Sequence, residues 1–367
     1  MDDPETDHSS NSGEGQSVPH RRRPRYGGKN PRRFAEKYKE FAPERYADDV
    51  AKVLASGKTP AGTHRPIMVD EILATLALQP GETAVDCTLG YGGHAREMLA
   101  RIAPGADQPS GRLIALDVDP IELPKTLARL RASGWGEEIF TAVRSNFAGL
   151  PKVLAGLGLA GADAILADLG VSSMQLDDPA RGFTFKADGP LDLRLNPQRA
   201  PSAATWLARV STTDLETALT GNADEPHATL LARELTAGRT QTPYTRSRQL
   251  ANAIRTILHQ HRPGLDAESV DTSVRRVFQA LRIAVNDEFG VLDLFLRHLP
   301  LCLRPSGRVA ILTFHSGEDR RVKHAFRDGV RSGVYSATNE VIVKAGLAEL
   351  RANPRSASAK LRWATRA

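Results

Sequence analysis

Between residues 83 and 170, short apolar segments with strand character alternate with segments of helical character. The strand-like segments are TAVDC, GRLIALDVD, IFTAVRSN and DAILADLG, and the helical segments between them include AREMLARI, PIELPKTLARLRA and LPKVLAGLG. Because a helix that joins two such strands returns the chain to the start of a parallel neighbour, this alternation predicts a doubly wound α/β sheet. Ligands of such sheets bind outside the carboxyl ends of the strands.

The alternation stops for about a hundred residues, which carry loops and helical patterns such as SAATWLARV, TTDLETALT and SRQLANAIRTIL. Strand character returns with RVAILTF, and the later segments EVIVKA and KLRWATR predict a closing hairpin. We therefore expect a basic, partly disordered extension over residues 1–60, followed by one α/β domain. Residues 61–176 and 276–367 would form this domain, and residues 177–275 would form a helical insertion within it.

Composition narrows the class of protein. With 41% hydrophobic and 25% charged residues, the chain can bury a normal core, and it holds no apolar run of the roughly 18 residues that a membrane helix needs. Its polar start lacks the apolar core of a signal peptide, so we expect a cytoplasmic protein without a membrane partner. The two cysteines, Cys87 and Cys302, match no zinc spacing, and we expect no metal.

Positive charge gathers at both ends of the chain. The net charge is +6, residues 21–45 carry ten Lys and Arg against three Glu, and residues 351–367 carry five Lys and Arg and no acidic residue. Two basic segments in one chain favour contact with the phosphates of a nucleic acid.

A glycine turn follows the first strand-like segment. The residues GYGGHA satisfy the dinucleotide pattern G-x-G-x-x-G/A through Gly90, Gly92 and Ala95, without the Lys-Ser/Thr ending of a triphosphate-binding loop. Asp117 ends the second strand, where a carboxylate can accept both ribose hydroxyls of a nucleotide. Together they predict a cofactor that contains adenosine, and they do not separate NAD from S-adenosylmethionine. The polar loop ADLGVSSMQLDD after the fourth strand favours S-adenosylmethionine, since amino-methyltransferases place such a loop beside the reacting methyl group.

Seven blocks occur in the order HRPIMVDEIL, DCTLGYGGHARE, ALDVDP, ADLGVSSMQLDDPARGFTFKADGPLDLRLNP, FQALRIAVNDEF, RPSGRVAILTFHSGEDRRVK and NPRSASAKLR. Together they resemble the RsmH/MraW family, bacterial methyltransferases that act on N4 of a cytidine in the decoding region of small-subunit (16S) ribosomal RNA. The resemblance spans residues 64–367. It implies a Rossmann-like class I S-adenosylmethionine-dependent methyltransferase whose helical insertion recognises RNA. The implied partner is the rRNA or the assembled small subunit, and the oligomeric state stays open, a dimer included.

The resemblance also assigns roles to residues. It places the S-adenosylmethionine contacts on Gly92, Gly93, His94, Asp117, Phe147, Asp168 and Gln175. Asp168, or Ser172 as an alternative, is the candidate acceptor that holds a hydrogen of the substrate amine and turns its lone pair toward the methyl carbon. By charge and position, the candidate RNA contacts are Arg181, Arg194, Arg276 and Arg282, with His315 placed to meet the substrate.

Other readings stay open at this point. Tyr91, Met174 and Gly317 stand where the family usually has Arg, Pro and Leu, which leaves room for a divergent member that methylates another RNA nucleotide. The glycine turn also fits an NAD-dependent oxidoreductase, and the chain could be an RNA-binding assembly factor without catalysis. Methylation at C5 of cytosine needs a cysteine nucleophile, and neither cysteine belongs to a loop that faces the cofactor.

Overall fold

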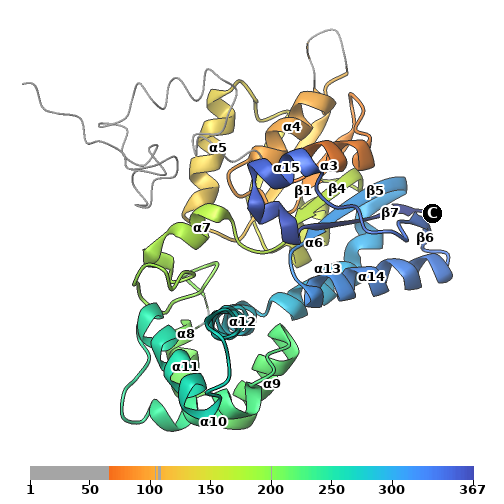
Figure 1. The fold of residues 1–367 in the computed structure, drawn as a ribbon. Helices are drawn as coiled ribbons and strands as arrows, with labels where there is room; N and C mark the ends of the chain where they lie inside the picture. Colours follow the sequence, from red (N-terminus) through yellow and green to blue (C-terminus); the bar gives the residue numbers. More distant parts are fainter. Residues whose placement is uncertain (1–65, 104, 106–108, 200) are drawn as a thin grey trace, which may run out of the picture.

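The computed structural model describes residues 66–103, 105, 109–199 and 201–367, so the extension over residues 1–60 lies outside the described residues. Within them, seven strands form one sheet in the order β3-β2-β1-β4-β5-β7-β6 (Figure 1). The strands are β1 (Thr83–Asp86), β2 (Arg112–Asp117), β3 (Phe140–Arg144), β4 (Ala162–Asp168), β5 (Leu303–Thr313), β6 (Tyr335–Thr338) and β7 (Lys360–Arg366). Strands β1 to β5 pair in parallel, whereas β7 is antiparallel to both β5 and β6. The predicted doubly wound α/β sheet is confirmed, with an antiparallel pair, β7 and β6, at one edge.

Alternate residues of the central strands face two apolar cores on opposite sides of the sheet, as the two-residue period of a strand requires. Leu113 and Leu166 belong to the core under α3 (Val69–Leu76), α4 (Gly93–Ile102) and α5 (Glu122–Ala132). Ile114 and Ile165 belong to the core under the second set of helices. That set contains α6 (Leu150–Gly156), α13 (Glu288–Cys302) and α14 (Ser316–Arg331). The sheet is therefore buried on both faces, and its ligand edge is left accessible.

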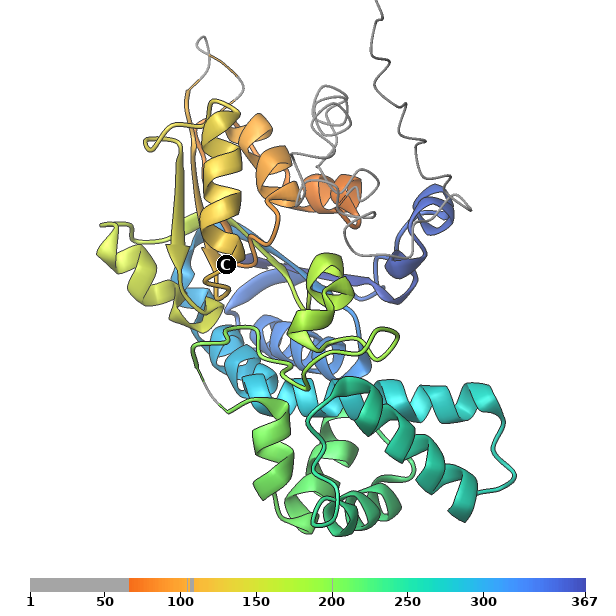
Figure 2. The same ribbon diagram turned by 90° about the vertical axis from the view of Figure 1, so that its left-hand side faces the viewer.

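A helical unit with a core of its own lies beside the sheet (Figures 1 and 2). It comprises α8 (Ala203–Arg209), α9 (Thr212–Ala223), α10 (Ala228–Gly238), α11 (Ser247–His261) and α12 (Ala267–Asn286). Side-chain oxygens of Ser202, Ser211 and Asp266 cap three of these helices by accepting the first free backbone N–H groups. The chain then passes from α12 into α13 through Asp287, in the left-handed region at φ 50°. The domain boundaries at residues 176 and 275 stay a prediction.

Short elements complete the described chain. They are η2 (Phe147–Gly149), α7 (Ser173–Asp177), η3 (Pro179–Arg181), α15 (Leu347–Ala352) and η4 (Pro354–Ser358). Among the described residues, none of the helices combines the length and the apolar character needed to cross a bilayer.

The predicted closing hairpin is wrong in one of its two strands. On the side away from β5, strand β7 pairs with β6, and EVIVKA forms only one isolated bridge, from Val343 to Leu361. Asn339 explains the difference, because its side-chain amide donates to the carbonyl of Leu361 and accepts from the N–H of Trp363. These are backbone groups of β7 that a longer partner strand would have paired. Val341 is consequently left 82% exposed.

The buried core of the helical unit should contribute to the free energy of unfolding of the protein. Leu231 in α10 is fully buried within it, so Leu231→Ala is expected to lower the free energy of unfolding by about 2–5 kcal/mol through lost burial and a cavity. Leu301→Ala is the matched control, because this leucine of α13 is 73% exposed and its loss should change stability by less than about 0.5 kcal/mol. Urea unfolding measures both, and equal losses would contradict the described core.

Candidate functional site

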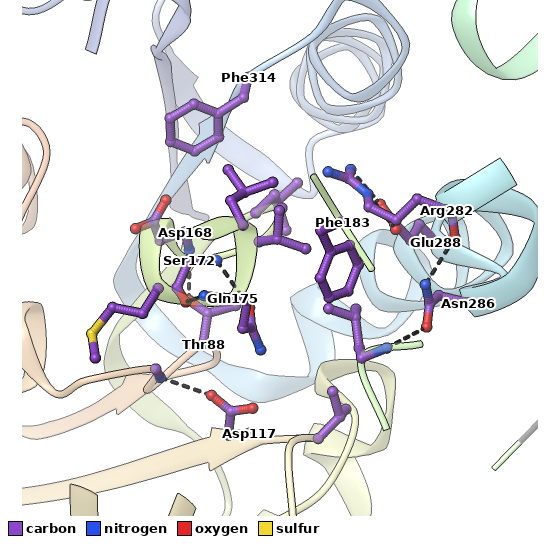
Figure 3. A pocket seen from close by; sticks show the side chains of 18 of the residues that line it. Thr88, Asp117, Asp168, Ser172, Gln175, Phe183, Arg282, Asn286, Glu288 and Phe314 are labelled. Carbon is purple, nitrogen blue, oxygen red and sulfur yellow. Dashed lines mark hydrogen bonds and ion pairs between the residues drawn. The ribbon is translucent and has the colours of Figure 1, made fainter. Parts of the chain in front are cut away.

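A cavity of about 1420 Å³ runs from the carboxyl edge of the sheet to the helical unit. Its sheet side includes Asp117, Phe147 and Asp168, and its helical side includes Phe183 and Phe278. Figure 3 shows Asp168, Ser172 and Gln175 on one side of this space, and Phe183, Arg282 and Asn286 on the other. Pockets for one small molecule measure about 300–1,000 Å³, so this cavity has room for two ligands side by side.

Three neighbouring strands end in aspartate at this edge. Asp86 ends β1, Asp117 ends β2 and Asp168 ends β4. Burial raises the pKa of Asp86 to about 6, although His94 and the N–H of Thr88 pull it down. Burial, with a contribution from the Glu318 carboxylate, raises the pKa of Asp168 to about 7. Carboxyl groups whose pKa values are raised this far in a cavity are candidates for a functional site.

The glycine turn holds Asp117 in place. The N–H of Gly90 donates to Oδ2 of Asp117 over 2.7 Å, and the N–H of Asp119 donates to Oδ1 over 2.8 Å. Burial raises the pKa of Asp117, and these two N–H groups oppose that rise. A carboxylate offers about four lone-pair positions, so each oxygen keeps one for a ligand. The arrangement fits a diol such as the two hydroxyls of a ribose.

Each glycine of the turn has a different structural role. A Cβ on Gly90 would meet nothing closer than 3.8 Å, which leaves its surface open to the cavity. Gly92 has a positive φ of 75°, and a Cβ there would lie 2.9 Å from Thr126, so packing under α5 requires it. A Cβ on Gly93 would lie 2.4 Å from Pro66. Of the two glycines assigned by the family resemblance, Gly93 lines the cavity, whereas Gly92 belongs to the packing beneath it.

His94 lies beside Asp168, and both residues line the cavity. The imidazole is 8% exposed, with Nε2 3.0 Å from the carbonyl oxygen of Ile67 and Nδ1 3.6 Å from Oδ2 of Asp168. Burial lowers the pKa of His94 despite the carboxylate of Asp86. On the other side, the backbone N–H of Asp168 donates to Oγ1 of Thr88 over 2.7 Å. Asp168 is therefore fixed from the turn and from the start of α4.

The loop after β4 is closed by a capping box. Oγ of Ser172 accepts from the N–H of Gln175, and Oε1 of Gln175 accepts from the N–H of Ser172. Nε2 of Gln175 also donates to the buried Asp119 over 2.9 Å. Both Ser172 and Gln175 line the cavity, but these bonds already engage their polar groups in holding the loop.

Asp119 is a residue that the sequence analysis missed. Burial would raise its pKa, but hydrogen bonds from Arg181 and Gln175 lower the pKa overall. The Arg181 guanidinium lies 2.8 Å from the Asp119 carboxylate and also donates to the carbonyls of Arg194 and Leu195. Arg181 thus ties the loop after β2 to η3 and to the segment before α8. The second aspartate of ALDVDP was the available signal.

The candidate adenine contact lies in the wall of the cavity. Phe147 begins η2 after β3 and packs edge-on against Phe295 of α13, with ring centroids 5.2 Å apart. Its ring is half-buried, so it can serve both as packing and as one side of a flat pocket. Its contact with adenine stays a prediction.

The candidate RNA contacts are arranged differently from their expected places. Arg282 is bound to Glu288 through two hydrogen bonds of 2.8 Å and lies at the cavity with its side chain 14% exposed. The guanidinium of Arg194 is hydrogen-bonded to Asp192. Arg276 is half-buried on α12 and does not line the cavity. The exposed cations that line the cavity are Arg144, Lys186, Arg199 and Arg275. Arg275 and Arg276 are consecutive residues of α12, and their side chains leave the helix in different directions, so Arg275 lines the cavity and Arg276 does not.

His315 caps α14 and lines the cavity, with Nε2 3.2 Å from Oε1 of the buried Glu318. Its ring centroid lies 5.7 Å from that of Phe289. The same phenylalanine accounts for Gly317, because a Cβ there would lie 2.5 Å from Cζ of Phe289. Tyr91, another departure from the family pattern, lies under the guanidinium of Arg129.

Both thiols are buried in the structure. Cys87 directly follows β1 and touches the cavity wall, which the sequence analysis did not expect. Burial raises its pKa well above the ordinary value, and burial raises the pKa of Cys302 to about 11. A thiol held in its protonated form is a poor nucleophile, so these side chains do not suit attack on a pyrimidine ring.

The chain is similar to known proteins over most of its length. The model of the MraW methylase family matches residues 61–367. The ribosomal RNA small subunit methyltransferase H 1 of Lachnoclostridium phytofermentans is 47% identical over 358 residues, covering 96% of this chain and 95% of that protein. The ribosomal RNA small subunit methyltransferase H 2 of Alkaliphilus metalliredigens is also 47% identical, covering 94% of this chain and 97% of that protein.

Among solved structures, TrmN of Thermus thermophilus aligns over 82% of this chain and 48% of its own, with 14% identity and a TM-score of 0.38. The family model covers five-sixths of the sequence, from just before the first described helix to the last residue. On this match and on the identity to its curated relatives, the chain belongs to the MraW methylase family.

Proposed function

We propose that this protein transfers a methyl group from S-adenosylmethionine to N4 of a cytidine in small-subunit ribosomal RNA. The observation that carries the proposal is the position of Asp168, at the end of a central strand and inside a cavity with room for two ligands. The names of the relatives support the ribosomal substrate. The choice of N4 rests on the family resemblance and on the chemistry of Asp168.

The residues at the carboxyl edge suit the methyl donor. Asp117 would accept the ribose hydroxyls, because each of its oxygens keeps a lone pair beyond its backbone partners. Phe147 would form one wall for the adenine. Because Gly90 has no side chain, the ligand could approach the protein backbone closely there. When bound, the sulfonium group supplies an electrophilic methyl carbon.

Asp168 would orient the substrate amine. The N4 lone pair of cytosine is delocalised into the ring, so the protein has to turn that lone pair toward the methyl carbon. One oxygen of Asp168 would accept a hydrogen from the amine and fix this orientation. Such placement lowers the barrier by several kcal/mol, and by up to roughly 7–11 kcal/mol in the best intramolecular cases.

The far side of the cavity suits an extruded base. Phe183, which follows η3, and Phe278 of α12 line this side. Aromatic faces of this kind stack on bases. Taking the target base out of its stack costs a few kcal/mol, less where the base is already unpaired. The exposed cations Arg144, Lys186, Arg199 and Arg275 would contact the flanking phosphates.

The product identifies the reaction directly. Small subunits or rRNA from cells that lack this protein would be incubated with it and a methyl-labelled donor, digested to nucleosides and analysed by mass spectrometry. We expect the label in N4-methylcytidine. Label in another nucleoside would show a divergent substrate, and RNA binding without label would show a protein that does not catalyse the transfer.

Asp168→Asn should separate activity from stability. The pKa of Asp168 is raised from 3.8 to about 7, so folding disfavours the ionised form. Its contribution to stability is greatest below about pH 4 and falls as the pH rises toward 7. At pH 8 the variant should therefore unfold with a free energy about 1–3 kcal/mol higher than the wild type, allowing for partial solvent screening, while methyl transfer falls at least about 100-fold.

Urea unfolding between pH 4 and 8 measures this gain, which should shrink toward pH 4. Asp163→Asn is the matched control in the same strand, because its carboxylate is paired with Arg304 and with the N–H of Thr83. Removing that charge should bring no gain in stability. An Asp168→Asn variant that is less stable at pH 8 than the wild type, or as active, would contradict the assignment.

Arg275 and Arg276 form a matched pair for RNA binding. Arg275→Ala removes an exposed cation at the cavity, so RNA binding should weaken and the slope of log K against log salt should fall by about one. Arg276→Ala, half-buried and outside the cavity, should change the slope less. Filter binding over a range of salt concentrations measures both slopes. A larger effect of Arg276→Ala would contradict the assignment of Arg275 as the RNA contact on α12.

A further inference from the structure

Two atoms that both carry lone pairs, Nδ1 of His94 and Oδ2 of Asp168, face each other in the wall of the cavity. Nε2 of His94 lies 3.0 Å from the carbonyl oxygen of Ile67, which can only accept, so Nε2 carries a hydrogen. In a neutral imidazole the other nitrogen, Nδ1, then holds a lone pair, and it lies 3.6 Å from Oδ2 of Asp168. An ionised carboxylate facing that lone pair would be repelled. A proton between His94 and Asp168 removes this repulsion, so the geometry favours a shared proton.

Four carboxylates act electrostatically on this pair. Glu318 of α14 faces Asp168, whereas Asp86 of β1, Glu97 of α4 and Glu349 of α15 act on His94. Oδ2 of Asp86 is buried without a hydrogen-bond partner among the described residues. This carboxylate can therefore balance a positive imidazolium without any other group having to move. These negative charges therefore favour a second proton on the pair, held by the imidazole of His94.

We propose that His94 is a positioning residue for methyl transfer, which holds one proton with Asp168 and takes up the proton that the substrate amine releases. This inference rests on the proposed function for its substrate. It differs from the role implied by the family resemblance, in which His94 contacts the methyl donor. Both ring nitrogens of His94 face protein atoms, the carbonyl oxygen of Ile67 and Oδ2 of Asp168, which supports a role through Asp168 although His94 also lines the cavity.

The proton can be followed through the step. The N4 lone pair forms the new N–C bond as the C–S bond breaks, and the electron pair of that bond stays on sulfur as a thioether. N4 then carries one proton too many and releases it to Oδ1 of Asp168, while the proton on Oδ2 moves to Nδ1 of His94. Asp168 ends as a neutral acid, as it began. The imidazolium of His94 ends beside the carboxylate of Asp86.

Two substitutions of His94 separate its two nitrogens. The amide of His94→Asn lies near the place of Nδ1 and that of His94→Gln near the place of Nε2, but neither amide takes up a proton. Each variant should lose about 100-fold in kcat, while its Kd for S-adenosylhomocysteine changes less than about threefold. Because the acceptor must be unprotonated, the wild-type kcat should fall on the acid side, and this limb should disappear in both variants. His259→Asn, at an exposed histidine of α11, is the control.

Wild-type kcat in either variant would overturn the proposal. So would a rise in Kd that parallels the loss of kcat, because His94 would then contact the donor itself. Nitrogen-15 NMR of the His94 ring in the wild type needs neither folding of a variant nor activity. It should show a protonated Nε2 and a bare Nδ1 near neutral pH, whereas a protonated Nδ1 would overturn the shared proton. A wild type without methyl transfer would refute the proposed function and leave this result intact.

Discussion

The site depends on one electrostatic constraint: three parallel neighbours, β2, β1 and β4, each end in a carboxyl group at the same buried edge. Three such charges cannot be ionised together without compensation, because desolvation and mutual repulsion act in the same direction. Backbone N–H groups stabilise Asp117, whereas Asp86 and Asp168 respond with raised pKa values. The glycine turn supplies a compensating donor to Asp117 through the N–H of Gly90, and His94 lowers the pKa of Asp86 electrostatically.

The helical unit completes the cavity through polar connections. Asp119, buried after β2, binds Gln175 of α7 and Arg181 of η3. From the other direction, Asn286 at the end of α12 accepts from the N–H of Leu195 and donates to the carbonyl of Leu193. Hydrogen bonds are directional, so they fix this loop where apolar contacts alone would leave it free to slide. The two walls of the cavity are held at a defined separation as a result.

The fold and the strand ends could be predicted from sequence because their signals are local. Alternating apolar segments mark the strands, and an aspartate that follows one must lie at the carboxyl edge, as Asp117 and Asp168 do. The closing hairpin could not be predicted, since β-branched residues favour a strand wherever they occur and the capping by Asn339 is a tertiary effect. The contact of Arg181 with Asp119 depends likewise on a partner 62 residues away. Glu288 lies only six residues from Arg282, but it belongs to the next helix, and the sequence does not indicate how the two helices meet.

The central claim is that the edge formed by these strands presents a methyl donor and a pyrimidine amine to each other across Asp168. A crystal structure of the protein with S-adenosylhomocysteine and an RNA fragment that contains the target cytidine tests it most directly. We expect the ribose on Asp117, the cytosine between the sheet and Phe183, and its N4 within hydrogen-bond distance of an Asp168 oxygen. A cytosine bound outside this cavity, or one whose N4 points away from Asp168, would contradict the account.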